Sequence, residues 1–93
     1  MSRMYYAADR ETAQRALADL RMTRLDERAA TLAALHRQRS EVASERSDDI
    51  PRLQAWVSIH RLYDAVKSGE DGDLKPLWQD AIARTAAWHQ SLR

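Results

Sequence analysis

The chain has 93 residues, enough for one domain with a single core and too few for an elaborate active-site cleft. Lys and Arg number 15 and Asp and Glu number 14, so the net charge of +1 requires neither nucleic acid nor an anionic membrane as a partner. Cysteine is absent, which excludes disulfides and thiolate metal sites, and no stretch is long and apolar enough for a signal peptide or a membrane span. We therefore expect a single domain over residues 1–93, in the cytoplasm and without membrane contact.

The content of large aliphatic residues is low. Leu, Ile and Val account for 16 of the 93 residues and Phe is absent, which places the chain under the rough floor of about 20% for globular domains. Disorder would also need a high net charge, and three tryptophans add large apolar surfaces. We expect a folded domain whose core is marginal. Burial of apolar surface between two copies would stabilise it, so we expect a homodimer. The 13 Arg against 2 Lys are typical of a GC-rich bacterial or phage genome.

The first fifty residues contain neither glycine nor proline, which favours helix throughout. Asp9 can cap a helix over about residues 9–20, and a start further back, through Tyr5 and Tyr6, stays open. The apolar face of this helix consists of Ala13, Ala16, Leu17 and Leu20.

The apolar register then slips, because Leu20 and Leu25 are five residues apart. From there a heptad seam continues through Leu25, Arg28, Leu32, Leu35, Arg39, Val42 and Arg46. Thr23 and Asp26 resemble a capping box, so we expect a break at 21–23 and a second helix over about 24–46. An unbroken helix over 9–46 would be about 57 Å long, against about 30 Å for a compact domain of this size. The alternative is one kinked long helix that pairs with its copy in an elongated dimer.

Turn signals divide the second half of the chain. Asp49 can cap a helix over about 50–67 with Pro51 in its first turn, and Gly69 offers a left-handed C-terminal cap. Asp73 can cap a last helix over about 73–91. No strand-like alternation occurs, so the sequence predicts an all-α bundle of three to four helices.

The apolar positions of the 50–67 helix cover an arc of roughly 220° at about 100° per residue. Its two stripes consist of Leu53, Trp56, Val57, His60 and Tyr63, and of Ala55, Ile59, Leu62 and Val66. We expect this helix to be buried on two sides, at the centre of the bundle or against a second copy. Trp56, Trp78 and Trp88 all fall on apolar stripes, which favours core packing over stacking on single-stranded nucleic acid.

The histidines offer the only metal-like spacing, at His60 and Asp64 one helical turn apart. Many helical pairs share that spacing, and His60 lies on an apolar stripe, which is typical of a hydrogen-bonded core histidine. The sequence contains no nucleophile and base constellation, no glycine-rich phosphate loop and no H-E-x-x-H motif. We expect no enzyme activity, no metal and no cofactor.

The arginines around the register slip are the sharper signal. Arg21, Arg24 and Arg28 recur at three- and four-residue intervals, and Arg28 and Arg39 occupy seam positions that should be apolar. One interpretation is that their aliphatic stems cover neighbouring leucines while the guanidinium groups reach water or nearby carboxylates. The other is a recognition strip, since the planar guanidinium group pairs well with carboxylates.

We therefore predict a non-enzymatic adaptor or inhibitor, of the kind found among bacterial or phage accessory proteins. It would dock a helical or coiled-coil protein partner through an Arg/Leu seam on residues 21–46. The contact residues would be Arg21, Arg24, Arg28, Leu32, Leu35 and Arg39. One alternative is a regulator that contacts nucleic-acid phosphates through basic residues of the same region, although the acidic residues that follow weaken it. The other is a purely self-assembling structural protein.

Overall fold

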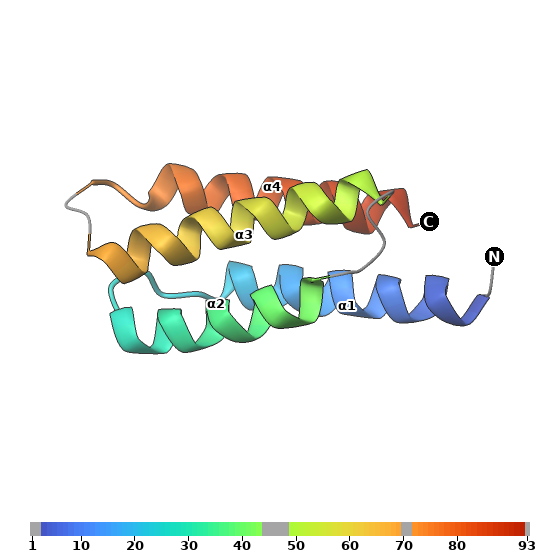
Figure 1. Ribbon diagram of the computed structural model, residues 1–93, viewed down its shortest axis with the longest axis horizontal. Helices are drawn as coiled ribbons and strands as arrows, with labels where there is room; N and C mark the ends of the chain where they lie inside the picture. Colours follow the sequence, from blue (N-terminus) through green and yellow to red (C-terminus); the bar gives the residue numbers. More distant parts are fainter. Residues whose placement is uncertain (1–2, 44–48, 70–71, 93) are drawn as a thin grey trace.

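The computed structural model describes residues 3–43, 49–69 and 72–92. These residues form four α-helices and no strand: α1 (Arg3–Arg21), α2 (Arg28–Val42), α3 (Ile50–Ser68) and α4 (Lys75–Ser91) (Figure 1). The all-α bundle is thus confirmed. None of the described helices combines the length and apolarity needed to cross a bilayer.

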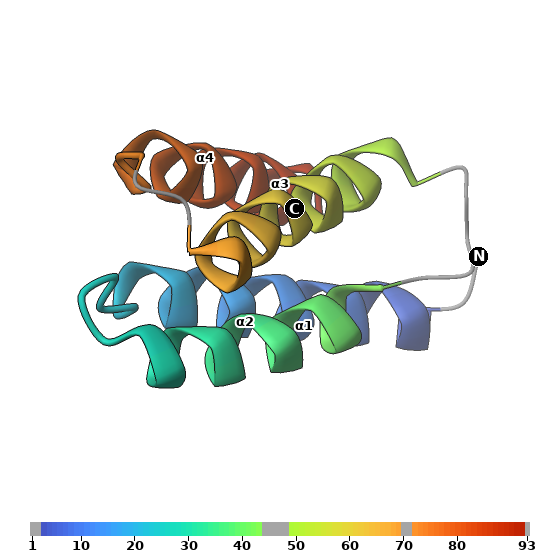
Figure 2. The ribbon, with the colours of Figure 1, turned by 60° about the vertical axis from the view of Figure 1, so that its left-hand side comes forward.

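Each helix runs antiparallel to the one before it, and the bundle has two layers, α1 with α2 and α3 with α4 (Figures 1 and 2). Helix α1 packs against α2 and α4, and α3 packs against the same two helices, so α2 and α4 lie diagonally opposite. The molecule measures 44 × 21 × 19 Å with a radius of gyration of 13.0 Å, close to the value of about 13 Å for a compact chain of this size.

The first half of the chain forms two separate helices, so the single kinked helix is wrong. Helix α1 begins at Arg3 rather than near residue 9, which places Asp9 inside the helix and not at its cap. The extension through Tyr5 and Tyr6 is therefore the correct alternative for the backbone. The register slip predicts a short first helix and a longer second one, which is wrong, because α1 is the longer of the two.

The connection after α1 is longer than the break expected at 21–23, because α2 begins only at Arg28. The capping box does not form: the Thr23 hydroxyl donates back to the Asp19 carbonyl at 2.9 Å, and the N-cap of α2 is Glu27, without a side-chain cap hydrogen bond. Thr31 instead ties the connection to α2, since its hydroxyl donates to the Arg24 carbonyl at 2.6 Å. Helix α2 ends at Val42, and the predicted last turn around Arg46 lies outside the described residues.

The predicted boundaries of α3 are confirmed. The Asp49 carboxylate accepts a hydrogen bond of 3.4 Å from the Arg52 backbone N–H, and Pro51 lies in the first turn. Gly69 ends the helix with φ at 67°. Helix α4 begins at Lys75, and its N-cap residue is Leu74. The predicted cap residue Asp73 lies one position before Leu74, and its carboxylate accepts a hydrogen bond of 3.0 Å from the Lys75 N–H.

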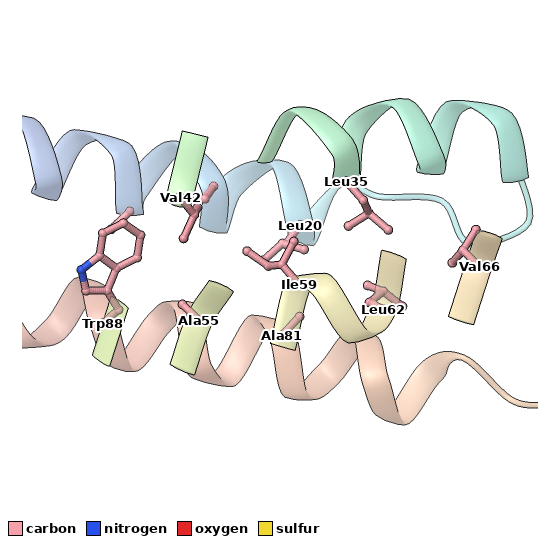
Figure 3. Close-up of a cluster of buried hydrophobic side chains, with 11 residues drawn as sticks. Leu20, Leu35, Val42, Ala55, Ile59, Leu62, Val66, Ala81 and Trp88 are labelled. Atoms are coloured by element: carbon pink, nitrogen blue, oxygen red, sulfur yellow. The ribbon is translucent and has the colours of Figure 1, made fainter. Parts of the chain in front are cut away.

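All four helices contribute to one apolar core (Figure 3). Trp88 is its largest fully buried side chain, and Figure 3 shows it beside Val42 and Ala55 at one end of the cluster. Trp56 and Trp78 are half-buried against this core, and their indole N–H groups donate to the Arg39 and Leu20 carbonyls at 3.1 and 2.7 Å. The prediction that the tryptophans pack in the core is therefore confirmed. The remaining members of the cluster are Ala13, Ala16, Leu20, Leu35, Ile59, Leu62, Val66 and Ala81.

Helix α3 is central to the bundle but is not buried over its whole apolar arc. Ala55, Ile59 and Leu62 are fully buried between α2 and α4. At the N-terminal end, by contrast, Ile50 is 52% and Leu53 46% exposed. The expected burial on two sides thus holds for the middle of the helix and fails at its start, where Ile50 and Leu53 stay about half exposed.

Candidate docking face on α2 and α3

The structure divides the predicted Arg/Leu seam between two environments. At about 100° per residue, Leu35 and Val42 lie on one edge of the seam and Arg28, Leu32 and Arg39 on the other. The first edge faces the core, where Leu35 and Val42 are fully buried. The second edge faces α3, and Leu32 is half-buried there. Leu35 is therefore out of reach of any partner that docks on the folded bundle.

Arg28 closes the C-terminal end of α3. Its Nε and Nη2 atoms donate to the Val66 and Lys67 carbonyls at 3.1 and 2.8 Å. These carbonyls belong to the last turn of α3, which carries the negative end of the helix dipole. The Val66 carbonyl also accepts a hydrogen bond of 3.3 Å from the Gly69 N–H. Arg28 thus has a structural role, while its side chain stays exposed at the surface.

Arg39 is the centre of a cluster of rings. Its guanidinium carbon lies 4.2 Å from the centroid of the Tyr63 ring, a favourable cation–π distance. Its Nη1 atom lies 3.3 Å from Nδ1 of His60, and its Nη2 atom lies 3.3 Å from Nδ1 of His36. Arg39 therefore links two imidazoles and a phenol from neighbouring helices.

The donors and acceptors in this cluster determine the form of the two histidines. Arginine has no acceptor atoms, so both Nδ1 atoms must accept hydrogen bonds from Arg39 and cannot carry a proton. For His60 the proton then resides on Nε2, which lies 3.2 Å from a carboxylate oxygen of Asp64.

Two further contacts extend the cluster along α3. The Trp56 and His60 rings are stacked, with centroids 5.0 Å apart and an interplanar angle of 7°. The ammonium group of Lys67 lies 5.8 Å from the centroid of the Tyr63 ring. We call this surface the α2–α3 face; it consists of Arg28, Leu32, His36, Arg39, Trp56, His60, Tyr63 and Lys67.

The structure places the other two predicted arginines elsewhere. Arg21 is exposed at the end of α1, and Arg24 is exposed in the connection to α2. Arg24 lies 3.7 Å from the Asp26 carboxylate and 3.4 Å from that of Glu27, as the surface-pairing interpretation expects. Arg24 borders a shallow groove of about 360 Å³ between α1 and α2, and Arg21 borders a different groove between α1 and α4. Three of the six predicted contact residues therefore share one face.

The structure also reveals a buried ion pair that the sequence analysis missed. Arg52 of α3 and Asp9 of α1 form a hydrogen-bonded salt bridge of 2.7 Å, and their side chains are only 10% and 11% exposed. The sequence does carry a signal for this pair, because each charged residue continues an apolar stripe. Asp9 lies one turn before Ala13 on the buried stripe of α1, and Arg52 lies one turn before Trp56 on an apolar stripe of α3. The pair stabilises the bundle and lies in its interior, away from the α2–α3 face.

The spacing of His60 and Asp64 does not develop into a metal site in the described residues. There, no group of three or more His, Asp, Glu or Cys side chains is arranged to hold a metal ion. The pair instead serves the ring cluster by holding the proton on Nε2 of His60. No protein-family model, no curated protein and no solved structure matches the chain.

Proposed function

We propose that the protein is a non-enzymatic interaction module whose α2–α3 face binds an acidic helical segment of a protein partner. The observation that carries this proposal is the charge of the face. Arg39 and Lys67 lie over the Tyr63 ring, and Arg28 bonds to the Lys67 carbonyl at the end of α3, so three cations face one carboxylate, that of Asp64 beside His60. A surface with an excess of positive charge favours encounter with, and orientation of, a negatively charged partner.

The length and composition of the face favour a helix as the bound element. The face extends along α2, whose 15 residues correspond to about 22 Å at 1.5 Å per residue. Leu32, Trp56 and Tyr63 are half-buried along it and leave apolar surface between the cations. Apolar anchors flanked by charges are the usual means by which a groove holds an amphipathic helix. Tyr, Trp and Arg are also the residues that dominate binding energy at interfaces.

The condition of the aromatic rings favours an acidic protein over nucleic acid. Binding of single strands relies on aromatic faces that are free to stack with bases. Here one face of Trp56 is stacked on His60, and Tyr63 lies beneath the Arg39 guanidinium. A carboxylate needs no ring face, because it can approach the guanidinium fork and the ammonium group directly.

The test is a titration with a synthetic amphipathic helix of about 20 residues, with glutamates on one side and leucines on the other. A version with lysine in place of each glutamate serves as its control. We expect the acidic peptide to bind, to weaken as salt is added, and the basic peptide not to bind. Equal binding of both peptides, or of neither, would contradict the proposal, and binding of a DNA duplex alone would assign the face to nucleic acid.

The two lysines of the chain provide a matched pair of variants. Lys67→Glu reverses a charge on the α2–α3 face and should weaken binding of the acidic peptide about tenfold, or about 1.4 kcal/mol. Lys75→Glu makes the same change on α4, which does not pack against α2, and should leave the affinity as it is. Equal losses from both substitutions would mean that only the net charge of the protein matters.

A further inference from the structure

The contact between Arg39 and its two histidines constrains their protonation. Each terminal nitrogen of the guanidinium fork lies 3.3 Å from an imidazole Nδ1. A protonated imidazole would place an N–H group against the N–H groups of Arg39, with two positive charges in contact. Arg39 can therefore keep both hydrogen bonds only while His36 and His60 are neutral.

We propose that the α2–α3 face takes up protons when it binds its acidic partner, through His36 and His60. This inference rests on the proposed function of the face. A partner carboxylate can engage both terminal nitrogens of Arg39 in charge-assisted hydrogen bonds, which are stronger than the present bonds to neutral nitrogen. Each Nδ1 atom then loses its donor, binds a proton from solvent, and turns from acceptor to donor toward the incoming carboxylates.

The charges around the two imidazoles determine the sign of the effect. In the free protein Arg39 contacts both imidazoles, Asp64 contacts His60 alone, and Arg28 and Lys67 lie at the neighbouring end of α3. The Tyr63 ring also faces the cluster, with its centroid 6.1 Å from that of the His36 ring. Bound carboxylates add negative charge beside both rings and favour their charged forms. The bound state thus holds more protons than the free state.

Solvent can deliver these protons without unfolding of the bundle. The His60 side chain is 36% exposed, and His36 is exposed on α2. By linkage, affinity rises as the pH falls through the range in which the imidazoles titrate, by up to about tenfold per pH unit for each proton taken up. The partner would be held more tightly in acidic than in alkaline conditions.

The experiment measures affinity for the acidic peptide between about pH 8 and pH 5.5 at constant ionic strength, a range in which its glutamates stay ionised. Calorimetry near pH 6.5 in two buffers of different ionisation enthalpy counts the protons directly. We expect uptake of one to two protons and an affinity at least tenfold higher at the acidic end. Intact binding without proton uptake would overturn this inference and leave the proposed function standing, whereas failure to bind at every pH would overturn the proposed function.

Histidine variants separate the cluster from general charge effects. His36→Gln and His60→Gln should each lower the number of protons taken up, and the double variant should abolish the uptake and flatten the pH profile. His89→Gln is the matched control, because His89 lies on α4 beside Gln14 and Arg21 of α1. The control should retain the full pH dependence, and an equal loss in all three variants would overturn the inference. Circular dichroism confirms folding, and the proton count of the unaltered protein decides the question if a variant unfolds.

Discussion

The guanidinium group of Arg52 on α3 donates a hydrogen bond of 2.7 Å to the carboxylate of Asp9 on α1. The same guanidinium donates to the Val42 carbonyl at 2.8 Å and, through Nη2, to the Glu41 and Ala43 carbonyls at 3.2 and 3.3 Å. It therefore satisfies carbonyls at the C-terminal end of α2. Its central carbon also lies 5.1 Å from the centroid of a Trp88 ring on α4. One side chain thus connects all four helices.

Removal of this side chain should destabilise the bundle strongly. Arg52→Ala removes the buried contact with Asp9, and loss of one member of a buried pair costs about 3–5 kcal/mol. Urea unfolding measures the difference in free energy of unfolding. Arg61→Ala, on an exposed position of the same helix, should change stability by less than about 0.5 kcal/mol, and a similar small loss for Arg52→Ala would show that the pair is dispensable.

Gln38 is the opposite case, a buried polar side chain that we expect to reduce stability. It is fully buried on α2, one turn from Leu35 and Val42, and neither its amide nitrogen nor its oxygen has a hydrogen-bond partner among the described residues. Gln38→Leu removes the cost of dehydrating this amide and should raise the free energy of unfolding by about 1–3 kcal/mol. Gln79→Leu on the exposed surface of α4 is the control. A lower melting temperature for Gln38→Leu would mean that the amide has a partner in solution.

The two glycines allow a test of backbone conformation, because the same Gly→Ala substitution can be made at both positions. Gly69 has a φ of 67°, whereas Gly72 does not have a left-handed φ, and a Cβ atom added at either position meets nothing within 4 Å. Gly69→Ala should therefore cost about 1 kcal/mol, because an L-residue is strained in that region. Gly72→Ala should have little effect. Equal thermal unfolding of the two variants would contradict the left-handed cap at the end of α3.

Arg28 should stabilise the end of α3 locally. Arg28→Ala removes one donor from each of the Val66 and Lys67 carbonyls, of which Val66 keeps the Gly69 N–H. The change should cost about 1 kcal/mol, a small value because the guanidinium group is exposed. Hydrogen exchange should show faster opening of the last turn of α3. Arg37→Ala is the comparison, because Arg37 lies 3.5 Å from Asp19 in an exposed pair and should contribute less than about 0.5 kcal/mol. Slower or unchanged exchange in α3 would count against the capping role of Arg28.

The features of the fold that could be predicted are those with a local cause. Asp49 reaches the N–H of Arg52 three residues on, and Gly69 adopts its conformation without help from another helix. The length of the connection after α1 was not predictable in this way. The Thr23 hydroxyl can either cap the start of α2 or donate to the Asp19 carbonyl, as it does here. Which of the two hydrogen bonds forms depends on how α2 packs against α1 and α3.

The candidate site shows the same division. Sequence spacing singled out Arg28, Leu32 and Arg39, which do share a face, but it also included Leu35, which is buried. It could not connect Arg39 with His60, 21 positions later, or Arg28 with the end of α3, 39 positions later. A heptad template treats both edges of the seam as one contact surface, and the split between the buried edge of Leu35 and Val42 and the edge of Arg28, Leu32 and Arg39 follows from where the neighbouring helices lie.

The sequence by itself therefore determined the helical content, the boundaries of α3 and the core positions of the tryptophans, since helix propensity, capping and apolar periodicity act within a few residues. Tertiary structure alone decided which arginines serve the interior and which the surface. Arg52 and Arg39 have the same side chain and both lie near apolar stripes. The role of each guanidinium group depends on the hydrogen-bond acceptors that surround it. The acceptors that decide between them, Asp9 of α1 for Arg52 and His60 of α3 for Arg39, come from helices that only folding brings alongside.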